Sequence, residues 1–182
     1  MPASGPTPIL IISGPPGVGK TATAEILAQR SARSVHLESD AFFNFIRAGY
    51  VEPWKPESHE QNQNVMRIVA EAASGYAAAG YFTIVDGIVI PGWFLEPLRD
   101  ALHDAGHEVA YVVLRAPLST CEARARNRER EPLTDSDVVK QLWQSFADLG
   151  NLEPNALDLG KETPDEAADL VAQRLAAGLL TI

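Results

Sequence analysis

Short apolar runs alternate along the chain with longer segments in which apolar positions recur every three or four residues. The run at 9–12 is continuously apolar instead of alternating, which is typical of a parallel strand buried on both faces. Similar runs, bounded by Gly, Pro or charged residues, predict strands over 7–13, 33–38, 81–85, 108–114 and 155–159. Helices are expected from about 22 to 32, over 40–48, 57–79, 93–105, 117–131 and 134–149, and from 163 onwards. The alternation predicts an α/β fold whose parallel sheet is covered by helices on both faces, with its ligand at the carboxyl ends of the strands.

Two of these helices carry more specific expectations. Ser39 is a favourable N-cap for the helix over 40–48, and Gly49 would end that helix. The core stripe of the helix over 57–79 is expected at Val65, Ile68, Ala72 and Tyr76.

The composition fits one folded domain over residues 1–182, with 46% hydrophobic and 21% charged residues. A formal net charge of −9 argues against binding to nucleic acid, which needs clustered Lys and Arg. The single cysteine, Cys121, suits a reducing compartment and a place in the core. No apolar run is long enough for a signal peptide or a membrane span, so we expect a cytoplasmic protein without membrane contact.

The segment 14–21, Gly-Pro-Pro-Gly-Val-Gly-Lys-Thr, matches the P-loop pattern between a buried strand and a helix start. Its glycines let consecutive backbone N–H groups point at one anion, in front of a helix N-terminus. A chance Gly/Pro turn is the alternative, but both flanks fit the motif. The lysine would reach the β- and γ-phosphates of ATP, and the threonine hydroxyl would coordinate Mg²⁺. The residues expected to bind the nucleotide are Gly14, Pro15, Pro16, Gly17, Val18, Gly19, Lys20 and Thr21.

Asp86 ends a hydrophobic strand, as does the carboxylate that holds Mg²⁺ in many P-loop proteins. It could instead only cap the turn, because Asp-Gly is a common turn pair. The next residue, Gly87, is not the glutamate that activates water in many hydrolytic ATPases, which argues against a mechanochemical ATPase.

Asp40 follows the second expected strand and would lie at the same sheet edge as the P-loop. A carboxylate there can accept a proton from a substrate hydroxyl that attacks the γ-phosphoryl group, although the helix dipole alone favours Asp in a first helical turn. Asn44 and Arg47 follow at i+4 and i+7, so both should line the cleft if Asp40 does. Whether Asp40 or Asp86 contacts Mg²⁺ directly stays open.

Four arginines lie on the segment after Pro117, at 124, 126, 128 and 130. The apolar positions of this helix place Arg124 and Arg128 nearer the protein body, where they could neutralise the phosphoryl group in transit. The alternative is a solvated face paired with neighbouring glutamates.

Aromatic residues are concentrated between 42 and 54, where cations are few. Some must be core residues, but as a set they favour a partly apolar, uncharged acceptor over a phosphorylated one. The residues expected to bind it are Asp40, Phe43, Asn44, Arg47, Trp54 and Gln63.

Together, the P-loop at 14–21, the strand-end Asp40 and Asp86, the arginine-rich helix after Pro117 and the closing strand before 160–166 resemble the small-molecule kinases of the P-loop fold. That group includes shikimate kinase, gluconate kinase, the zeta toxins and chloramphenicol phosphotransferase, and the Ser39-Asp40 pair is most similar to the last. The resemblance implies a five-stranded parallel sheet in the order 2-3-1-4-5, a substrate-binding region at about 40–80 and an Arg-bearing lid at about 124–135. It also implies Asp40 as the catalytic base and an adenine pocket that includes Gly160.

These observations favour an ATP-dependent phosphotransferase that acts on a small-molecule hydroxyl, with antibiotics and related natural products among the candidate acceptors. Lys20, Arg124 and Arg128 would stabilise the transferred phosphoryl group, and Thr21 and Asp86 would hold Mg²⁺. A nucleoside or nucleotide kinase is one alternative. A nucleotide-binding ATPase or switch without a small acceptor is the other.

Overall fold

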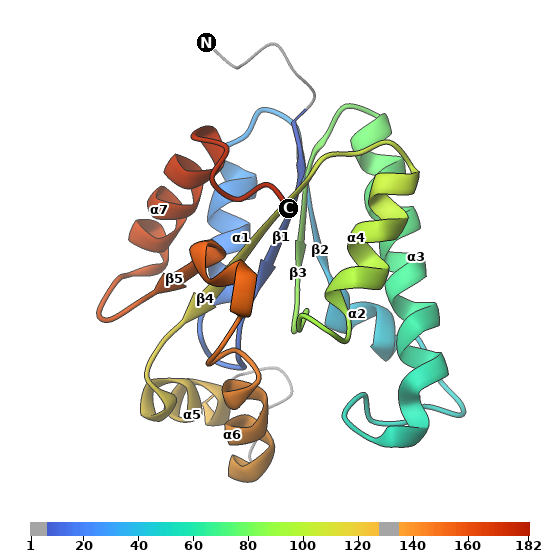
Figure 1. Cartoon of the computed structure of the whole chain (residues 1–182), viewed down its shortest axis with the longest axis vertical. Coiled ribbons are helices and arrows are strands. Elements are labelled where there is room, and N and C mark those ends of the chain that lie inside the picture. The colour runs from blue at the N-terminus through green and yellow to red at the C-terminus, as the bar shows by residue number, and fades with distance from the viewer. Residues whose placement is uncertain (1–6, 128–134) are drawn as a thin grey trace.

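The computed structural model describes residues 7–127 and 135–182 and contains a five-stranded, fully parallel sheet in the order β2-β3-β1-β4-β5 (Figure 1). The strands are β1 (Ile9–Ser13), β2 (Ser34–Glu38), β3 (Phe82–Asp86), β4 (Val109–Arg115) and β5 (Ala156–Asp158). The expected architecture and strand order are confirmed.

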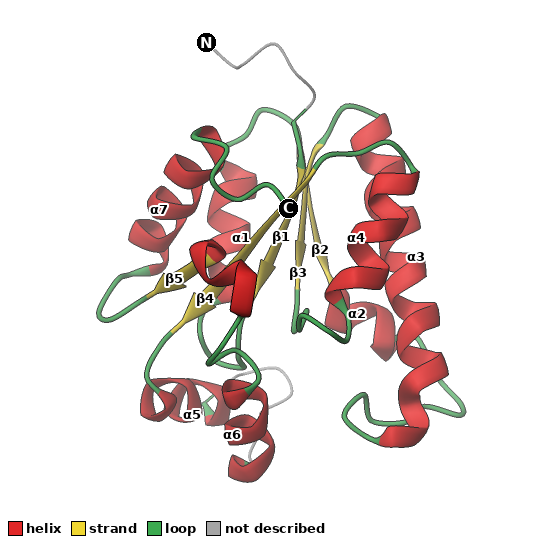
Figure 2. Ribbon diagram, in the orientation of Figure 1, coloured by secondary structure: helices red, strands yellow, loops and turns green. Residues whose placement is uncertain are grey.

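Helices cover both faces of the sheet (Figure 2). One face carries α1 (Lys20–Gln29) and α7 (Pro164–Ala176), and the other carries α3 (His59–Ala78) and α4 (Leu95–Asp104). The central strand β1 contributes Ile9 and Ile11 to one core and Leu10 and Ile12 to the other, each at most 1% exposed. Its continuous apolar sequence therefore reflects burial on both faces, as expected.

Four further elements gather at the carboxyl ends of the strands (Figure 1). They are α2 (Ser39–Asn44), α5 (Leu118–Arg126), α6 (Ser136–Gln144) and the 3₁₀ helix Pro56–Ser58, whereas the 3₁₀ helix Gly150–Asn155 leads into the amino end of β5. This edge is where ligands bind in open parallel sheets. Within the described residues, no helix combines the length and the apolar character that a membrane crossing needs.

The helix after β2 is shorter than the sequence pattern predicts. It ends at Asn44 instead of Ala48, and the chain then turns with the Ile46 N–H donating to the Phe43 carbonyl oxygen. This turn packs Ile46 against the core, and that tertiary contact outweighs continuation of the helix. Ser39 is not the N-cap but the first helical residue, and it is 2% exposed.

The core stripe of α3 also differs from the expectation. Ile68 and Tyr76 are 46% and 42% exposed, whereas the buried face is formed by Asn62, Val65, Met66, Val69, Ala70 and Ala73. Apolar spacing alone does not choose between the two faces, because Val65, Val69 and Ala73 recur at helical spacing as the expected series does. Asn62 is buried because its amide donates hydrogen bonds to the Pro53 carbonyl and the Ser58 hydroxyl, each at 2.8 Å.

The P-loop backbone packs directly against α5. A Cβ atom at Gly17 would collide with the carbonyl oxygen of Cys121 and would lie 2.9 Å from the backbone nitrogen of Ala125. Gly17 also has a φ of +77°, a conformation that other L-residues adopt only with strain. Both the backbone conformation and the available space therefore require glycine at this position.

We expect Gly17→Ala to lower the free energy of unfolding by about 1–3 kcal/mol more than Gly106→Ala. Gly106 has a similar φ of +84°, but an added Cβ would have no neighbour within 4 Å, so the difference isolates the collision with α5. Urea denaturation of both variants measures it. Equal losses would show that α5 moves aside without cost.

Candidate active site

The P-loop connects β1 to α1 and supplies the first part of the site. Gly14 and Gly19 have φ values of +140° and +107°, and the loop ends in the first turn of α1, where backbone N–H groups lack helical partners. Lys20 is 4% exposed, and its Nζ donates a hydrogen bond to the Pro15 carbonyl oxygen at 3.1 Å. The lysine thus lies across its own loop. This arrangement can bind an anion through the backbone and place a cation beside it.

Asp86 ends β3 beside the P-loop strand, because it is paired in register with Ile12. It is 3% exposed, and its Oδ2 atom makes no hydrogen bond to any described residue. The nearest cationic group is His36, whose Nε2 atom lies 3.4 Å from Oδ2. Burial acts to lower the pKa of His36, but Asp86, together with Glu38 and Glu25, outweighs it and raises that pKa above its usual value. The sequence pattern alone did not identify His36 as a residue of the site.

A buried carboxylate with an unsatisfied oxygen fits a divalent cation. Thr21 lies in the first turn of α1, as the predicted second ligand. Among the described residues, no group of three or more His, Cys, Asp or Glu side chains could hold a metal by itself. Mg²⁺ commonly uses one or two protein ligands together with substrate phosphates and water.

Gly87 leaves no room for a side chain. An added Cβ atom would collide with Ser39 Oγ and would lie 3.0 Å from Ser39 Cβ. The buried Ser39 side chain therefore occupies the space in which residue 87 would need to hold a glutamate.

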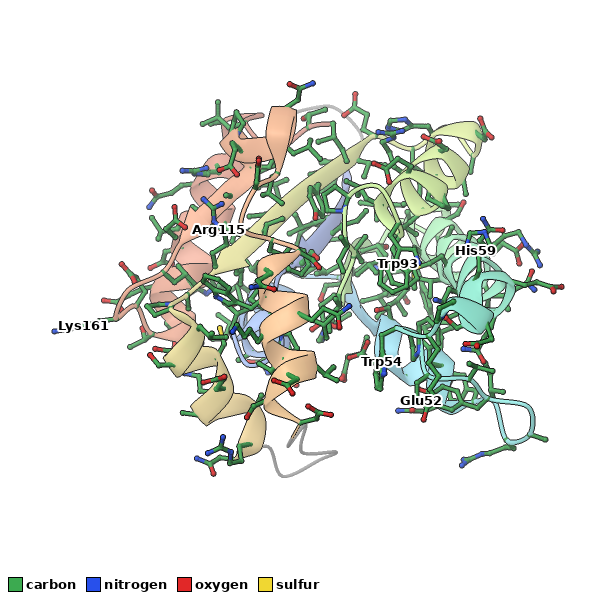
Figure 3. All side chains as sticks on the ribbon, turned by 60° about the horizontal axis from the view of Figure 1, so that its bottom comes forward. Glu52, Trp54, His59, Trp93, Arg115 and Lys161 are labelled. Carbon is green, nitrogen blue, oxygen red and sulfur yellow. The ribbon has the colours of Figure 1, made fainter. Side chains whose placement is uncertain are left out.

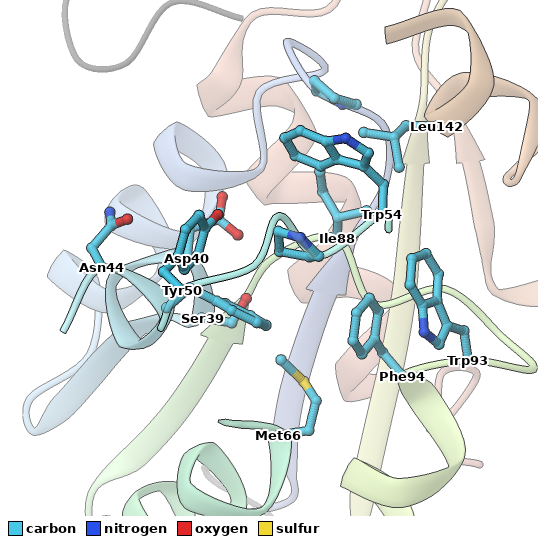
Figure 4. A pocket seen from close by; sticks show the side chains of 13 residues that line it. Ser39, Asp40, Asn44, Tyr50, Trp54, Met66, Ile88, Trp93, Phe94 and Leu142 are labelled. Carbon is cyan, nitrogen blue, oxygen red and sulfur yellow. The ribbon is translucent and has the colours of Figure 1, made fainter. Parts of the chain in front are cut away.

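A cavity of about 270 Å³ opens between the P-loop, α2, α3, α6 and the loop that follows β3 (Figure 4). Figure 4 shows Asp40, Asn44, Ser39 and Tyr50 on one side of it, with Trp93 and Phe94 across from them. Its lining is Pro16, Ser39, Asp40, Phe43, Asn44, Tyr50, Pro53, Trp54, Met66, Ile88, Trp93, Phe94 and Leu142. None of these described lining residues is Lys, Arg or His. The cavity is thus a mostly apolar space with one polar side.

Four of the predicted acceptor residues line this cavity: Asp40, Phe43, Asn44 and Trp54. Arg47 does not, because α2 ends before it, and the helical face that would have aligned it with Asp40 does not exist. Gln63 is exposed on α3 and lies outside the cavity. The residue of α3 that lines the cavity is Met66. Neither Arg47 nor Gln63 lines this cavity, and their assignment as acceptor residues stays a prediction.

The predicted lid falls largely outside the described residues. Arg128 and most of 124–135 belong to that part of the chain. Arg124 is exposed on α5, whereas Cys121 and Ala125 are buried, and its role near the transferred phosphoryl group stays a prediction. Behind α5, Trp143 of α6 donates its indole N–H to the Ala116 carbonyl oxygen at 2.8 Å.

At the β5 side of this sheet edge, a cationic side chain is paired with two carboxylates. Arg115 donates to Asp158 through Nε and Nη2 at 2.8 and 3.1 Å, and to Glu153 through Nη1 at 3.2 Å. Gly160, expected near adenine, follows β5 in this neighbourhood, and its N–H donates to Glu162. Figure 3 shows Arg115 and Lys161 on one side of the sheet edge, with Trp54 and Trp93 on the other. Arg115 and Lys161 are therefore separated from these two tryptophans.

The loop after β3 forms a cavity wall that the sequence reading did not identify. Val89 anchors this loop: its N–H donates to Ser13 Oγ at 2.9 Å, and its carbonyl oxygen accepts from Ser13 Oγ at 3.0 Å and from the Tyr111 hydroxyl at 2.7 Å. The anchor fixes the loop that carries Trp93 and Phe94. The sequence could have indicated this loop as part of the site, because the loop directly follows the strand-end Asp86. No sequence signal indicated Leu142, which lies on the distant α6.

Comparison with known proteins places the chain in a family and a fold. The family model AAA_33, described as an AAA domain, matches residues 9–152. No curated protein matches the chain at a significant level.

Three solved structures illustrate the fold. A tunicamycin resistance protein from Deinococcus radiodurans is 23% identical with a TM-score of 0.71, and the match covers 96% of this chain and 98% of that one. A sugar kinase from a Janibacter species is also 23% identical, with a TM-score of 0.68 and coverage of 97% and 100%. The APS kinase of Mycobacterium tuberculosis, solved with AMPPNP and APS, is 18% identical, with a TM-score of 0.66 and coverage of 94% and 99%. The chain thus has the fold of P-loop small-molecule kinases.

Ser13→Ala should lower the free energy of unfolding by about 1–3 kcal/mol, because it leaves the buried Val89 N–H without a partner. Tyr111→Phe is the matched control and should cost less, because the Val89 carbonyl oxygen still accepts from Ser13. Urea denaturation of each variant checks this. A smaller loss for Ser13→Ala than for Tyr111→Phe would contradict the assignment of Ser13 as the anchor.

Proposed function

The chain belongs to the AAA-domain family that matches residues 9–152, and from that premise we propose that it is an ATP-dependent kinase acting on a hydroxyl group of a small molecule. One observation carries the proposal. The P-loop residue Pro16 and the strand-end carboxylate Asp40 line the same cavity. A phosphate donor on the P-loop and an acceptor in the cavity would therefore meet beside a proton acceptor.

In the proposed reaction, Asp40 accepts the proton of the acceptor hydroxyl as its oxygen bonds to the γ-phosphorus of ATP. The bond from that phosphorus to the β–γ bridging oxygen breaks, and ADP leaves with the electron pair. Lys20 and Arg124, together with Arg128 from outside the described residues, would neutralise charge on the transferred group. Mg²⁺, held by Thr21 and Asp86, would supply further neutralisation at the phosphate oxygens.

The cavity supports a neutral, partly apolar acceptor. A carboxylate or phosphate group on the acceptor would need a cationic partner, and no described residue of the lining is a cation. The indoles of Trp54 and Trp93 and the ring of Phe94 offer flat apolar surfaces for a ring system. Antibiotics, related natural products, neutral sugars and nucleosides are the classes to test.

The structure gives less support to an ATPase or switch without an acceptor. Ser39 fills the space beside residue 87, where such an enzyme would need a water-activating glutamate. An ATPase or switch without an acceptor would also have no use for a cavity of about 270 Å³ beside the P-loop.

Asp40→Asn should lower kcat by about 10²–10⁴-fold while the Kd for Mg·ATP changes less than threefold, because only the proton acceptor is removed. Glu60→Gln is the matched control: it removes an exposed first-turn carboxylate from α3 and should leave both values unchanged. Equal losses in turnover and nucleotide affinity for Asp40→Asn would make Asp40 a structural residue.

Thermal-shift screening tests the acceptor class. Mg·ATP should raise the Tm, and with Mg²⁺ and a non-hydrolysable ATP analogue, neutral hydroxylated ring compounds should raise it further through linkage, whereas sugar acids and nucleoside phosphates should not. Trp54→Ala should abolish the second increase and keep the first, whereas Tyr76→Ala, which removes an aromatic of similar exposure outside the cavity (42% against 40%), should keep both. No shift with Mg·ATP would overturn the proposed function.

A further inference from the structure

The contact between His36 and Asp86 joins two neighbouring strands behind the P-loop. His36 on β2 pairs in register with Ile84 of β3, and Asp86 lies two residues further along β3. Ile84 packs in the core beneath α1 and α7, and side chains two residues apart on a strand share a face, so His36 and Asp86 both face that side of the sheet. Their side chains are 12% and 4% exposed. The pair is therefore almost shielded from water.

The two atoms that face each other in this pair have no other partner within the described part of the chain. Nε2 of His36 and Oδ2 of Asp86 lie 3.4 Å apart, and both are buried without a hydrogen bond. A buried carboxylate is stable only when a charge or a donor compensates it. His36 is the one group in ion-pair contact with Asp86 among the described residues.

We propose that His36 is a positioning residue for Asp86, whose imidazole restricts the carboxylate to the orientation in which it can take part in binding Mg·ATP. The inference rests on the proposed function, because it needs a divalent cation bound with the nucleotide. A carboxylate that binds a metal is commonly held by a second protein group, and loss of such a group costs 10–100-fold in metal affinity or activity. His36 lies on β2, which β3 separates from the P-loop strand β1, so nucleotide contacts that do not involve the metal should be independent of it.

Other carboxylates around His36 do not account for this contact. Glu25 from α1 and Glu38 from β2 also act electrostatically on the imidazole, but neither forms an ion pair with it. The imidazole lies within ion-pair distance of the buried Asp86 and not of either exposed glutamate. A positioning role for Asp86 requires this contact.

The test compares His36→Leu, which keeps bulk but loses the donor, with His36→Gln, which places an amide near the position of Nε2. Binding of a non-hydrolysable ATP analogue is measured by calorimetry, once with Mg²⁺ and once with EDTA. In His36→Leu the gain in affinity that Mg²⁺ provides should fall about tenfold, while the Kd in EDTA stays within twofold of wild type. His36→Gln should recover most of that gain.

His107→Leu is the matched control. His107 is a half-buried histidine whose Nε2 lies 2.9 Å from the Ser74 hydroxyl, away from the P-loop, and its loss should leave the Mg²⁺ gain unchanged. The Tm of each unliganded variant reports whether it folds. Should His36→Leu not fold, His36→Asn replaces it, because the shorter amide cannot reach Asp86 and should show the same loss.

Each outcome has one meaning. A Mg²⁺ gain in His36→Leu equal to that of wild type overturns the inference, and so does an equal loss of affinity with and without Mg²⁺, which makes His36 structural. Absence of any Mg²⁺ gain in the wild-type protein would refute the metal site of the proposed function and the inference with it. Absence of nucleotide binding altogether would refute the P-loop assignment.

Discussion

The position of β1 in the sheet governs the whole site. This strand is buried on both faces and is hydrogen-bonded to β3 on one side and to β4 on the other. Because all the strands are parallel, everything that follows their carboxyl ends must meet around the loop that leaves β1. The in-register pairing of Ile12 with Asp86 then places a carboxylate beside the start of the P-loop. The nucleotide and acceptor regions are thus consequences of one buried strand.

The two carboxylates at this edge occupy opposite environments. Asp86 is buried against a histidine, whereas Asp40 is exposed in the first turn of a short helix that borders the acceptor cavity. Placement of this kind commonly separates the roles of two acids in one site. A buried and compensated carboxylate suits a fixed ligand, and an exposed one can exchange a proton with a bound hydroxyl. Asp40 is the one charged residue among the described residues of the cavity lining.

The sequence was sufficient for the parallel sheet and the P-loop, because continuous apolar runs and a glycine motif are local signals, whereas the strand order came from the resemblance to P-loop small-molecule kinases. It failed where orientation depended on distant contacts. On α3, packing against the core buries Val69 and Ala73 in place of Ile68 and Tyr76, and Gln63 lies outside the cavity. Arg47 lies beyond the end of α2 and does not line the cavity. The sequence pattern does not identify His36 as a site residue, because only strand pairing brings it close to Asp86.

Nucleotide and acceptor regions share one structural support. Ser13, the last residue of β1, exchanges two hydrogen bonds with Val89, and the loop that Val89 anchors carries Trp93 and Phe94 to the cavity. On the other side, Gly17 packs against α5, and α5 contacts α6, which supplies Leu142 to the same cavity. A change in the P-loop backbone would therefore reach the cavity walls through these two contacts. Phosphoryl transfer depends mainly on positioning, so under the proposed function this connection would let one strand and its loop align donor and acceptor together.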